Sequence, residues 1–116
     1  MKLDGQVAIV VGSARGIGAA IARTFSQEGA SIVLVDLEKM KPQLDEVARE
    51  INQKRGKAIA IVADATDDGQ VNKMVDETIR RWGKIDILIN SVGLRGPLVP
   101  VQEITEQEWD WSSLST

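Results

Sequence analysis

The sequence predicts an α/β protein built on a doubly wound parallel β-sheet, and three observations support that prediction. Apolar runs of four or five residues alternate with stretches whose apolar residues recur at helical spacing. The turns between them are short, which is typical of strand–helix–strand units in a parallel sheet. A glycine-rich turn follows the first apolar run. Because crossovers between parallel strands are almost always right-handed, we expect the partial strand order 3-2-1-4, without the later strands of such a sheet.

The first strand and the turn after it are the most informative part of the sequence. Val7–Val11 is a continuous apolar run, as in a strand buried on both faces, and it stops at Gly12. Gly16 and Gly18 follow, and a helical pattern opens with Ile17, Ala20, Ile21, Thr24 and Phe25. Glycines let the backbone approach a phosphate, and the helix N-terminus points N–H groups and partial positive charge at it. We therefore expect a dinucleotide-binding turn; a tight turn without a ligand is the alternative.

The remaining elements follow from apolar periodicity and from glycines that stop helices. Further strands are expected at 32–35, 58–62 and 85–89. Helices are expected at 17–28, ended by Gly29, and at 41–54, with Pro42 in its first turn and Gly56 at its end. A third helix follows the cap residues Asp64-Ala65-Thr66-Asp67 and ends at Gly83; its apolar stripe is Val71, Met74, Val75, Ile79 and Trp82.

The chain changes character after the fourth expected strand. Asn90–Pro97 has the composition of a loop. Thr105–Trp111 has the pattern of a short helix that begins with a capping box. We expect residues 1–116 to form a single, truncated dinucleotide-binding domain, in which 94–116 are an irregular loop and a short terminal helix.

Composition narrows the class of protein. The 116 residues carry a formal net charge of −3 with Lys and Arg scattered, so we expect no nucleic-acid partner. No apolar run approaches the roughly 20 residues that cross a bilayer, and the N-terminus shows no signal-peptide pattern. The chain has no cysteine and no histidine, which leaves no disulfide, thiol or imidazole chemistry, and we expect no metal site. A cytoplasmic protein fits these features best.

The glycine spacing carries a resemblance to a known family. The order Gly12, Gly16, Gly18 is G-x-x-x-G-x-G, which resembles the T-G-x-x-x-G-x-G motif of the short-chain dehydrogenase/reductase family, with Val11 in place of the usual Thr. The resemblance implies a Rossmann-type fold and hydride transfer between a nicotinamide and a hydroxyl or carbonyl carbon. It also implies that the turn, with Arg15 and Ile17 beside its glycines, contacts the cofactor.

Asp36 indicates which cofactor is preferred. It ends the second strand, 18 residues after Gly18, where an acidic residue accepts hydrogen bonds from the adenosine ribose hydroxyls. A carboxylate also repels a 2′-phosphate, because like unit charges about 4 Å apart interact by about 4 kcal/mol at an effective dielectric constant of 20. Arg15 argues the other way, since basic residues in this turn often contact that phosphate in the family. We favour NAD over NADP, because a strand end holds Asp36 in place; a simple turn residue is the alternative.

Two further segments match the family's pattern at strand ends. Asp64 corresponds to the family's Asp that contacts the adenine amino group, and Ala65 supplies backbone beside it; a helix cap is the alternative for Asp64. Asn90 and Gly93, in N-S-V-G, match two positions of the family's N-N-A-G after the fourth strand. In the family this Asn steadies the sheet and the loop lines the cofactor site, whereas an ordinary turn is the alternative.

The chain supplies no catalytic residue that we can assign. The family uses a Tyr as general acid/base with an adjacent Lys, and this chain contains no tyrosine. Two functions therefore remain open: the NAD-binding portion of a dehydrogenase, inactive as this chain alone, and a non-catalytic NAD-binding or interaction module. Because the fourth strand would form a sheet edge, we also expect self-association through it; a fragment of a longer chain is the alternative.

Overall fold

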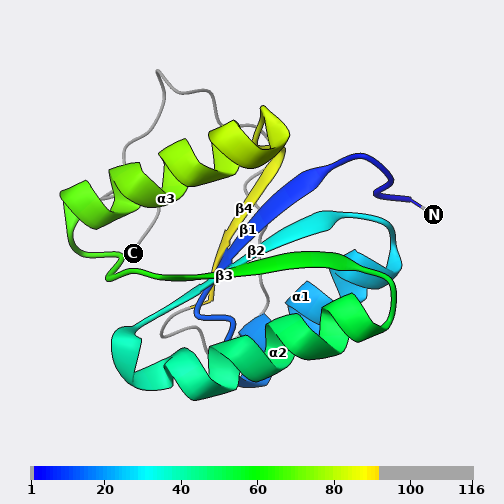
Figure 1. Cartoon of the computed structure of the whole chain (residues 1–116), viewed down its shortest axis with the longest axis horizontal. Coiled ribbons are helices and arrows are strands. Elements are labelled where there is room, and N and C mark those ends of the chain that lie inside the picture. Colours follow the sequence, from blue (N-terminus) through cyan, green and yellow to red (C-terminus); the bar gives the residue numbers. More distant parts are fainter. Residues whose placement is uncertain (1, 92–116) are drawn as a thin grey trace.

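The computed structural model describes residues 2–91, and they form a three-layer α/β unit (Figure 1). Its strands are β1 (Val7–Val11), β2 (Ser31–Asp36), β3 (Lys57–Val62) and β4 (Ile87–Asn90). Its helices are α1 (Gly16–Gln27), the 3-10 turn η1 (Glu38–Met40), α2 (Lys41–Gln53) and α3 (Asp68–Trp82). The alternation of strands and helices is the one that the apolar periodicity predicts.

The sheet has the predicted topology. The four strands are parallel, in the order β3-β2-β1-β4. In its register Val11 lies opposite Val35 on one side and opposite Asn90 on the other, and Asp36 lies opposite Val62. The carboxyl ends of all four strands therefore meet at one edge, with the topological reversal between β1 and β4, where doubly wound sheets bind their ligands.

Helices cover both faces of the sheet, with α1 and α2 on one side and α3 on the other (Figure 1). Alternate residues of β1 feed the two cores: Ala8 and Val10 pack with α1 and α2, whereas Ile9 and Val11 pack with α3. All five β1 residues are buried, as expected for a central parallel strand. Because β1 is held on both faces, the position of the glycine turn that follows it at the carboxyl edge of the sheet is fixed as well.

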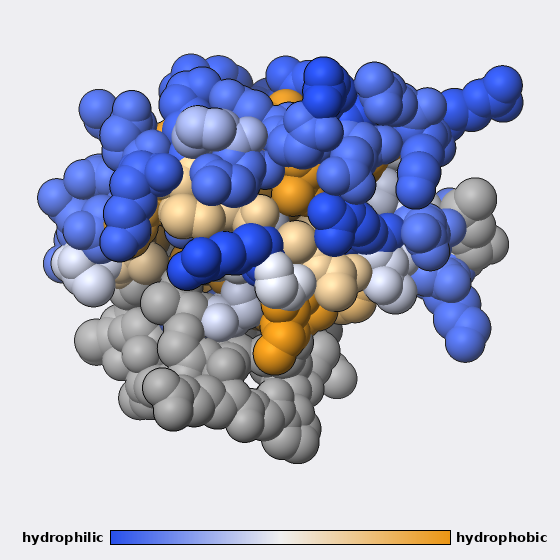
Figure 2. Space-filling model, turned by 90° about the horizontal axis from the view of Figure 1, so that it is seen from below, coloured by the Kyte–Doolittle hydropathy of each residue, from blue (hydrophilic) through white to orange (hydrophobic). Residues whose placement is uncertain are grey.

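Helix α1 packs on the sheet through a face that only partly coincides with its apolar pattern: Ile21 and Phe25 contact the core, whereas Ile17 does not face it. Its buried residues are Gly18, Ala19 and Ala22, whereas Ile17 is 48% exposed. Ala20 and Thr24 are exposed too, and Ile21 and Phe25 are half-buried. Small residues face the sheet because the start of α1 lies too close to β1 to leave room for larger side chains. In Figure 2, which looks from below onto the side of α1 and α2, apolar side chains come to the surface among hydrophilic ones.

Three other expectations differ in detail. The fourth strand begins at Ile87 rather than Ile85, because Asp86 instead bonds the start of β1 through its carboxylate (Val7 N to Oδ2, 2.8 Å) and its own N–H. In the last part of α3 the buried residue is Thr78 and not Ile79: the Thr78 hydroxyl donates to the Met74 carbonyl, and Ile79 is 42% exposed. Helix α2 ends at Gln53, one residue before the expected end, and the left-handed residue after it is Arg55 (φ 68°), which precedes Gly56.

Part of the sequence-based prediction lies outside the described residues. Gly93, the loop at 94–116 and the helix at 105–111 fall in this part of the chain. Across residues 2–91, no helix combines the length and apolarity that a membrane span requires. The same residues hold no group of three or more acidic side chains arranged to bind a metal ion.

Candidate dinucleotide-binding site

The glycine turn leaves β1 and folds back against the end of β2. Gly12 has φ 81°, a left-handed conformation that favours glycine. The N–H groups of Gly12 and Ser13 both donate to the Val35 carbonyl, at 2.7 and 3.2 Å. The Ser13 hydroxyl accepts from the Val35 N–H at 3.0 Å and is fully buried. The pairing of β1 with β2 ends at Val11, and beyond it the hydrogen bonds of Ser13 with Val35 hold the turn against β2.

Gly18 is the point of closest approach between α1 and the turn. A Cβ at this position would lie 2.1 Å from the Gly12 carbonyl oxygen and 2.5 Å from Ser91 Oγ. Neither distance is compatible with a side chain, so glycine is required here for packing. The third glycine of the motif therefore sets how near the helix start comes to β1 and β4.

The start of α1 is open on its outer side. Its cap residue Arg15 is extended (φ −160°) and makes no side-chain cap hydrogen bond, and the first turn holds no acidic residue. A Cβ on Gly16 (φ 63°) would meet no atom within 4 Å among the described residues. By contrast, α3 begins with a side-chain cap from Asp67 and with Asp68 in its first turn. Neither the cap residue nor the first turn of α1 therefore supplies a side chain that offsets the partial positive charge of this helix start.

Asp36 lies against the glycine turn, as the sequence predicts. Its Oδ2 accepts a hydrogen bond from the Ala14 N–H at 3.1 Å, and its Oδ1 accepts from the Leu37 N–H at 2.8 Å. Its backbone carbonyl accepts from the Ala63 N–H at 3.0 Å, which ties the ends of β2 and β3 together. Asp36 thus connects the end of β2 to the glycine turn through its carboxylate and to the end of β3 through its backbone carbonyl.

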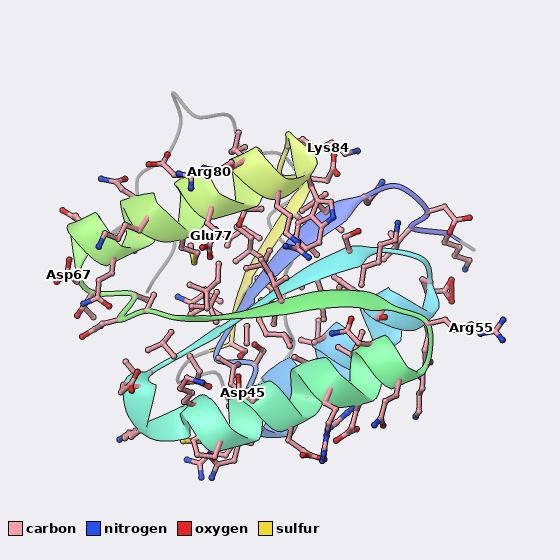
Figure 3. The ribbon with its side chains drawn as sticks, viewed as in Figure 1. Asp45, Arg55, Asp67, Glu77, Arg80 and Lys84 are labelled. Atoms are coloured by element: carbon pink, nitrogen blue, oxygen red, sulfur yellow. The ribbon has the colours of Figure 1, made fainter. Side chains whose placement is uncertain are left out.

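Asp64 lies just past β3 at the same edge of the sheet. Its Oδ1 accepts from both the N–H and the hydroxyl of Thr66, at 2.9 and 2.7 Å, and these bonds lower the pKa of the Asp64 carboxyl. The Asp64 side chain therefore stabilises the turn after β3 and does not cap α3. The cap of α3 is Asp67, whose Oδ1 accepts from the Gln70 N–H at 3.1 Å. Figure 3 shows Asp67 at the start of α3. Ala65 is half-buried and packs against the α3-side core.

The fourth strand brings Asn90 to the same edge. Asn90 lies opposite Val11 in the sheet register, and the next residue, Ser91, bonds the base of the glycine turn. The structure therefore places Gly12, Asp36, Asp64 and Asn90 along the carboxyl edge of the sheet, with Gly12 and Asn90 next to the reversal point and Asp36 and Asp64 on the β2 and β3 side. Gly93 lies outside the described residues.

Three residues of this region escaped the sequence-based prediction. Ser13 and Ser91 hold the turn through their hydroxyls, and serines in loops carry no periodic signal. Leu37 is an apolar residue that is 39% exposed directly after Asp36. Its position beside Asp36 was the available signal, since exposed leucines taken singly are common.

The strand order, the reversal point and the glycine turn define a dinucleotide-binding fold of the Rossmann type. The profile of the short chain dehydrogenase family matches residues 6–113, so the chain belongs to that family.

Relatives and solved structures agree with this assignment. The chain is 40% identical over 111 residues to a sorbitol dehydrogenase from Cereibacter sphaeroides, covering 95% of this chain and 41% of the relative. It is 34% identical over 110 residues to a 3-oxoacyl-[acyl-carrier-protein] reductase from Thermotoga maritima, covering 95% and 44%. The chain thus spans about two-fifths of the length of these curated relatives.

Among solved structures, a hydroxysteroid dehydrogenase from Escherichia coli superposes with a TM-score of 0.72 at 39% identity, covering 77% of this chain and 36% of that chain. A blue fluorescent protein from a metagenomic library, solved in complex with NADPH, gives a TM-score of 0.76 at 38% identity, covering 84% and 40%.

Proposed function

We propose that this chain is the NAD-binding portion of a short-chain dehydrogenase/reductase. The observation that carries the proposal is the position of Asp36, whose carboxylate lies at the glycine turn and within hydrogen-bond distance of its backbone (Ala14 N, 3.1 Å). This carboxylate lies at the end of the strand next to the diphosphate site, which is where the adenosine ribose of a bound dinucleotide lies in this type of fold.

The residues present fit a dinucleotide. The open side of Gly16 leaves room for a diphosphate at the first turn of α1. The helix brings neither a capping side chain nor an acidic residue of its own to that position. Unpaired N–H groups at a helix start are a good site for phosphate oxygens.

The adenosine end would lie between the ends of β2 and β3. Asp36 would accept hydrogen bonds from the ribose hydroxyls, and exposed Leu37 would pack against the adenine ring. Asp64 and Ala65 would border the adenine edge, although Oδ1 of Asp64 already accepts two bonds from Thr66. Asn90 and Gly93 would line the site beyond β4.

NAD is the preferred cofactor in this proposal. The carboxylate of Asp36 repels a 2′-phosphate and accepts from a 2′-hydroxyl. Exposed Arg15 at the turn is a neighbouring feature that favours NADP. The NADPH complex of the metagenomic blue fluorescent protein shows that a protein of this fold also accepts the phosphorylated cofactor. Binding of both cofactors therefore has to be compared directly.

The bound nicotinamide would supply hydride transfer to a carbonyl carbon or from an alcohol carbon, while this chain's residues bind and orient it. The 116 residues contain no tyrosine, histidine or cysteine. We therefore expect no turnover of simple alcohols by this chain alone. A non-catalytic NAD-binding module is the second candidate, and activity of the isolated chain on such alcohols would exclude it.

The same proposal includes self-association through β4. Within the described residues β4 pairs with no strand other than β1, so it is the edge strand on that side of the sheet. Sedimentation over a range of concentrations tests this: we expect a species heavier than 12.6 kDa, and a compact monomer at all concentrations would contradict it.

A thermal melt with added nucleotide tests cofactor binding. A ligand at 100 times its dissociation constant adds about 2.7 kcal/mol to the free energy of unfolding. We expect a larger rise in melting temperature with NAD than with NADP at equal concentration. Equal shifts would overturn the NAD preference, and no shift with either would overturn nucleotide binding.

A further inference from the structure

We propose that a groove at the amino edge of the sheet, opposite the candidate dinucleotide site, binds a small anion that carries several negative charges. The groove has a volume of about 540 Å³, which is in the usual range for small-molecule sites. It shares no residue with the candidate dinucleotide site, so the inference does not depend on the proposed cofactor. We call it the amino-edge groove; its charged and polar lining includes Ser26, Gln27, Ser31, Lys54, Arg55 and Lys57.

The three cations of the amino-edge groove come from the short turn between α2 and β3. Lys54 and Arg55 follow the last residue of α2, and Lys57 begins β3. All three residues are exposed, and none of them forms an ion pair within residues 2–91. Asp4 is the carboxylate that lines the groove beside them. The lining therefore carries an excess of positive charge, although the formal net charge of the whole chain is −3.

Uncharged polar side chains complete the lining. Ser26 and Gln27 come from the end of α1, and Ser31 comes from the start of β2. Their hydroxyl and amide groups can donate hydrogen bonds to the oxygens of an anion. Gly56 brings the cationic turn close to this wall, because a Cβ at this position would lie 2.3 Å from Ser26 Oγ. Cations from one segment and hydrogen-bond donors from another thus line the same groove.

The backbone of Arg55 indicates a role for its side chain. Arg55 has φ 68°, a conformation that glycine adopts without strain and that other residues adopt at a cost. Its side chain makes no hydrogen bond or ion pair within residues 2–91 and points away from the body of the molecule (Figure 3). A cation near the end of α2 would offset the negative partial charge of the helix carbonyls, but Lys54 already supplies one. A strained residue without such contacts is a reason to infer a function.

The exposure of the three cations decides the charge of the ligand. A single charge beside an exposed cation gains little free energy, because water and salt screen the interaction. An anion with several charges can contact two or three of these side chains at once, and the small gains then add. Pyrophosphate and citrate are both small anions of this kind, one with phosphate oxygens and the other with carboxylate oxygens.

The experiment is an NMR titration of the backbone amides of the whole chain at low ionic strength. Pyrophosphate and citrate are the two probes, and sodium chloride at the same ionic strength is the control for screening. We expect saturable shifts at residues 26–31 and 54–57 with at least one probe, and none there with sodium chloride. The probe that binds more tightly tells whether the site prefers phosphate or carboxylate. The absence of saturable shifts at these residues with both probes would overturn the inference.

Arg55→Gly is the sharpest variant, because it removes a cation and relieves the left-handed backbone at the same time. We expect about threefold to fivefold weaker binding of the anion, together with an unchanged or higher melting temperature. Loss of affinity in a protein that has not lost stability cannot be attributed to unfolding. Binding as tight as that of the wild type would contradict a contact between Arg55 and the anion and would overturn the inference.

A pair of double variants tests whether position or only total charge matters. Lys54→Gln with Lys57→Gln should weaken binding about tenfold. The matched control, Lys73→Gln with Arg80→Gln, removes the same charge from α3 and should change the affinity less than about twofold. Equal losses in both double variants would overturn the inference. Shifts of pyrophosphate at residues 12–18 report on the candidate dinucleotide site instead, so failure of either site is recognised separately.

Discussion

The Asp36 carboxylate accepts a hydrogen bond from the Ala14 backbone N–H, with 3.1 Å between Oδ2 and the nitrogen. The residue expected to hold the cofactor ribose thus also braces the turn expected to hold the diphosphate. Removing the side chain would disturb both parts of the site together. Variants at this position have to separate the charge of Asp36 from its bond to the turn.

Asp36→Asn removes the charge and keeps one acceptor oxygen, so it can retain one of the two backbone hydrogen bonds, from Ala14 or from Leu37. We expect it to narrow or reverse the difference between the NAD and NADP melting shifts, because the repulsion of a 2′-phosphate is lost. Asp36→Ala should also narrow the difference, and in addition lower the free energy of unfolding without ligand by about 1 kcal/mol through the lost hydrogen bond. An unchanged NAD preference in both variants would show that Asp36 does not select the cofactor.

Arg15→Gln tests the opposing charge in the turn. The side chain is exposed and makes no capping bond at the start of α1, so stability should stay within about 0.5 kcal/mol of wild type. NADP binding should weaken and NAD binding should change less, as measured by calorimetric titration. If Arg15→Gln lowered the affinity for NAD more than the affinity for NADP, a contact between Arg15 and the 2′-phosphate would be contradicted.

Gly18→Ala tests the close approach of α1 to the turn. The added methyl would lie 2.1 Å from a backbone oxygen, so we expect a loss of about 1–3 kcal/mol in urea unfolding. Gly69→Ala is the matched control in the first turn of α3, where the nearest atom is the Asp67 side chain at 3.3 Å. There we expect stability to be unchanged or raised by up to about 1 kcal/mol. Equal effects of both changes would argue against packing at Gly18.

Arg55→Gly should stabilise the protein. Arg55 has φ 68° after the end of α2, and its side chain points away from the body of the molecule (Figure 3). Glycine adopts this conformation without a Cβ clash, and we expect a gain of about 0.5–1 kcal/mol in urea unfolding. The neighbouring Lys54→Gly, at φ −93°, should destabilise by a similar amount. A loss of stability in Arg55→Gly would show that the arginine side chain contributes contacts of its own.

The Asp64 carboxyl should titrate below its ordinary range. Hydrogen bonds from the hydroxyl and N–H of Thr66 favour the charged form and lower the pKa of this group. The stabilisation is therefore fully present above the unfolded-state pKa and is lost as the pH falls through the folded-state pKa. NMR titration of Thr66→Val should show the Asp64 pKa moving up toward its ordinary value. A pKa that stays in place would contradict the role of the hydroxyl.

The sequence by itself determined the sheet and the strand ends. Val7–Val11 is apolar at every position, which predicts a strand buried on both faces, and right-handed crossovers left few plausible strand orders, of which the dinucleotide-fold order 3-2-1-4 was expected. Gly12, Asp36, Asp64 and Asn90 were placed at the carboxyl edge for the same reason. The carboxyl ends of neighbouring parallel strands meet at one edge of the sheet, and this does not depend on the contacts that their side chains make.

Only the tertiary structure decided which contacts the side chains make. The apolar stripe of α1 predicted burial of Ile17, yet the helix packs through Gly18 and Ala22, because a close approach to β1 admits only small residues. The bond from Ala14 to Asp36, and that from Ser91 to Gly12, join residues 22 and 79 positions apart. Such bonds follow from distances between folded segments, which no local pattern in the chain encodes.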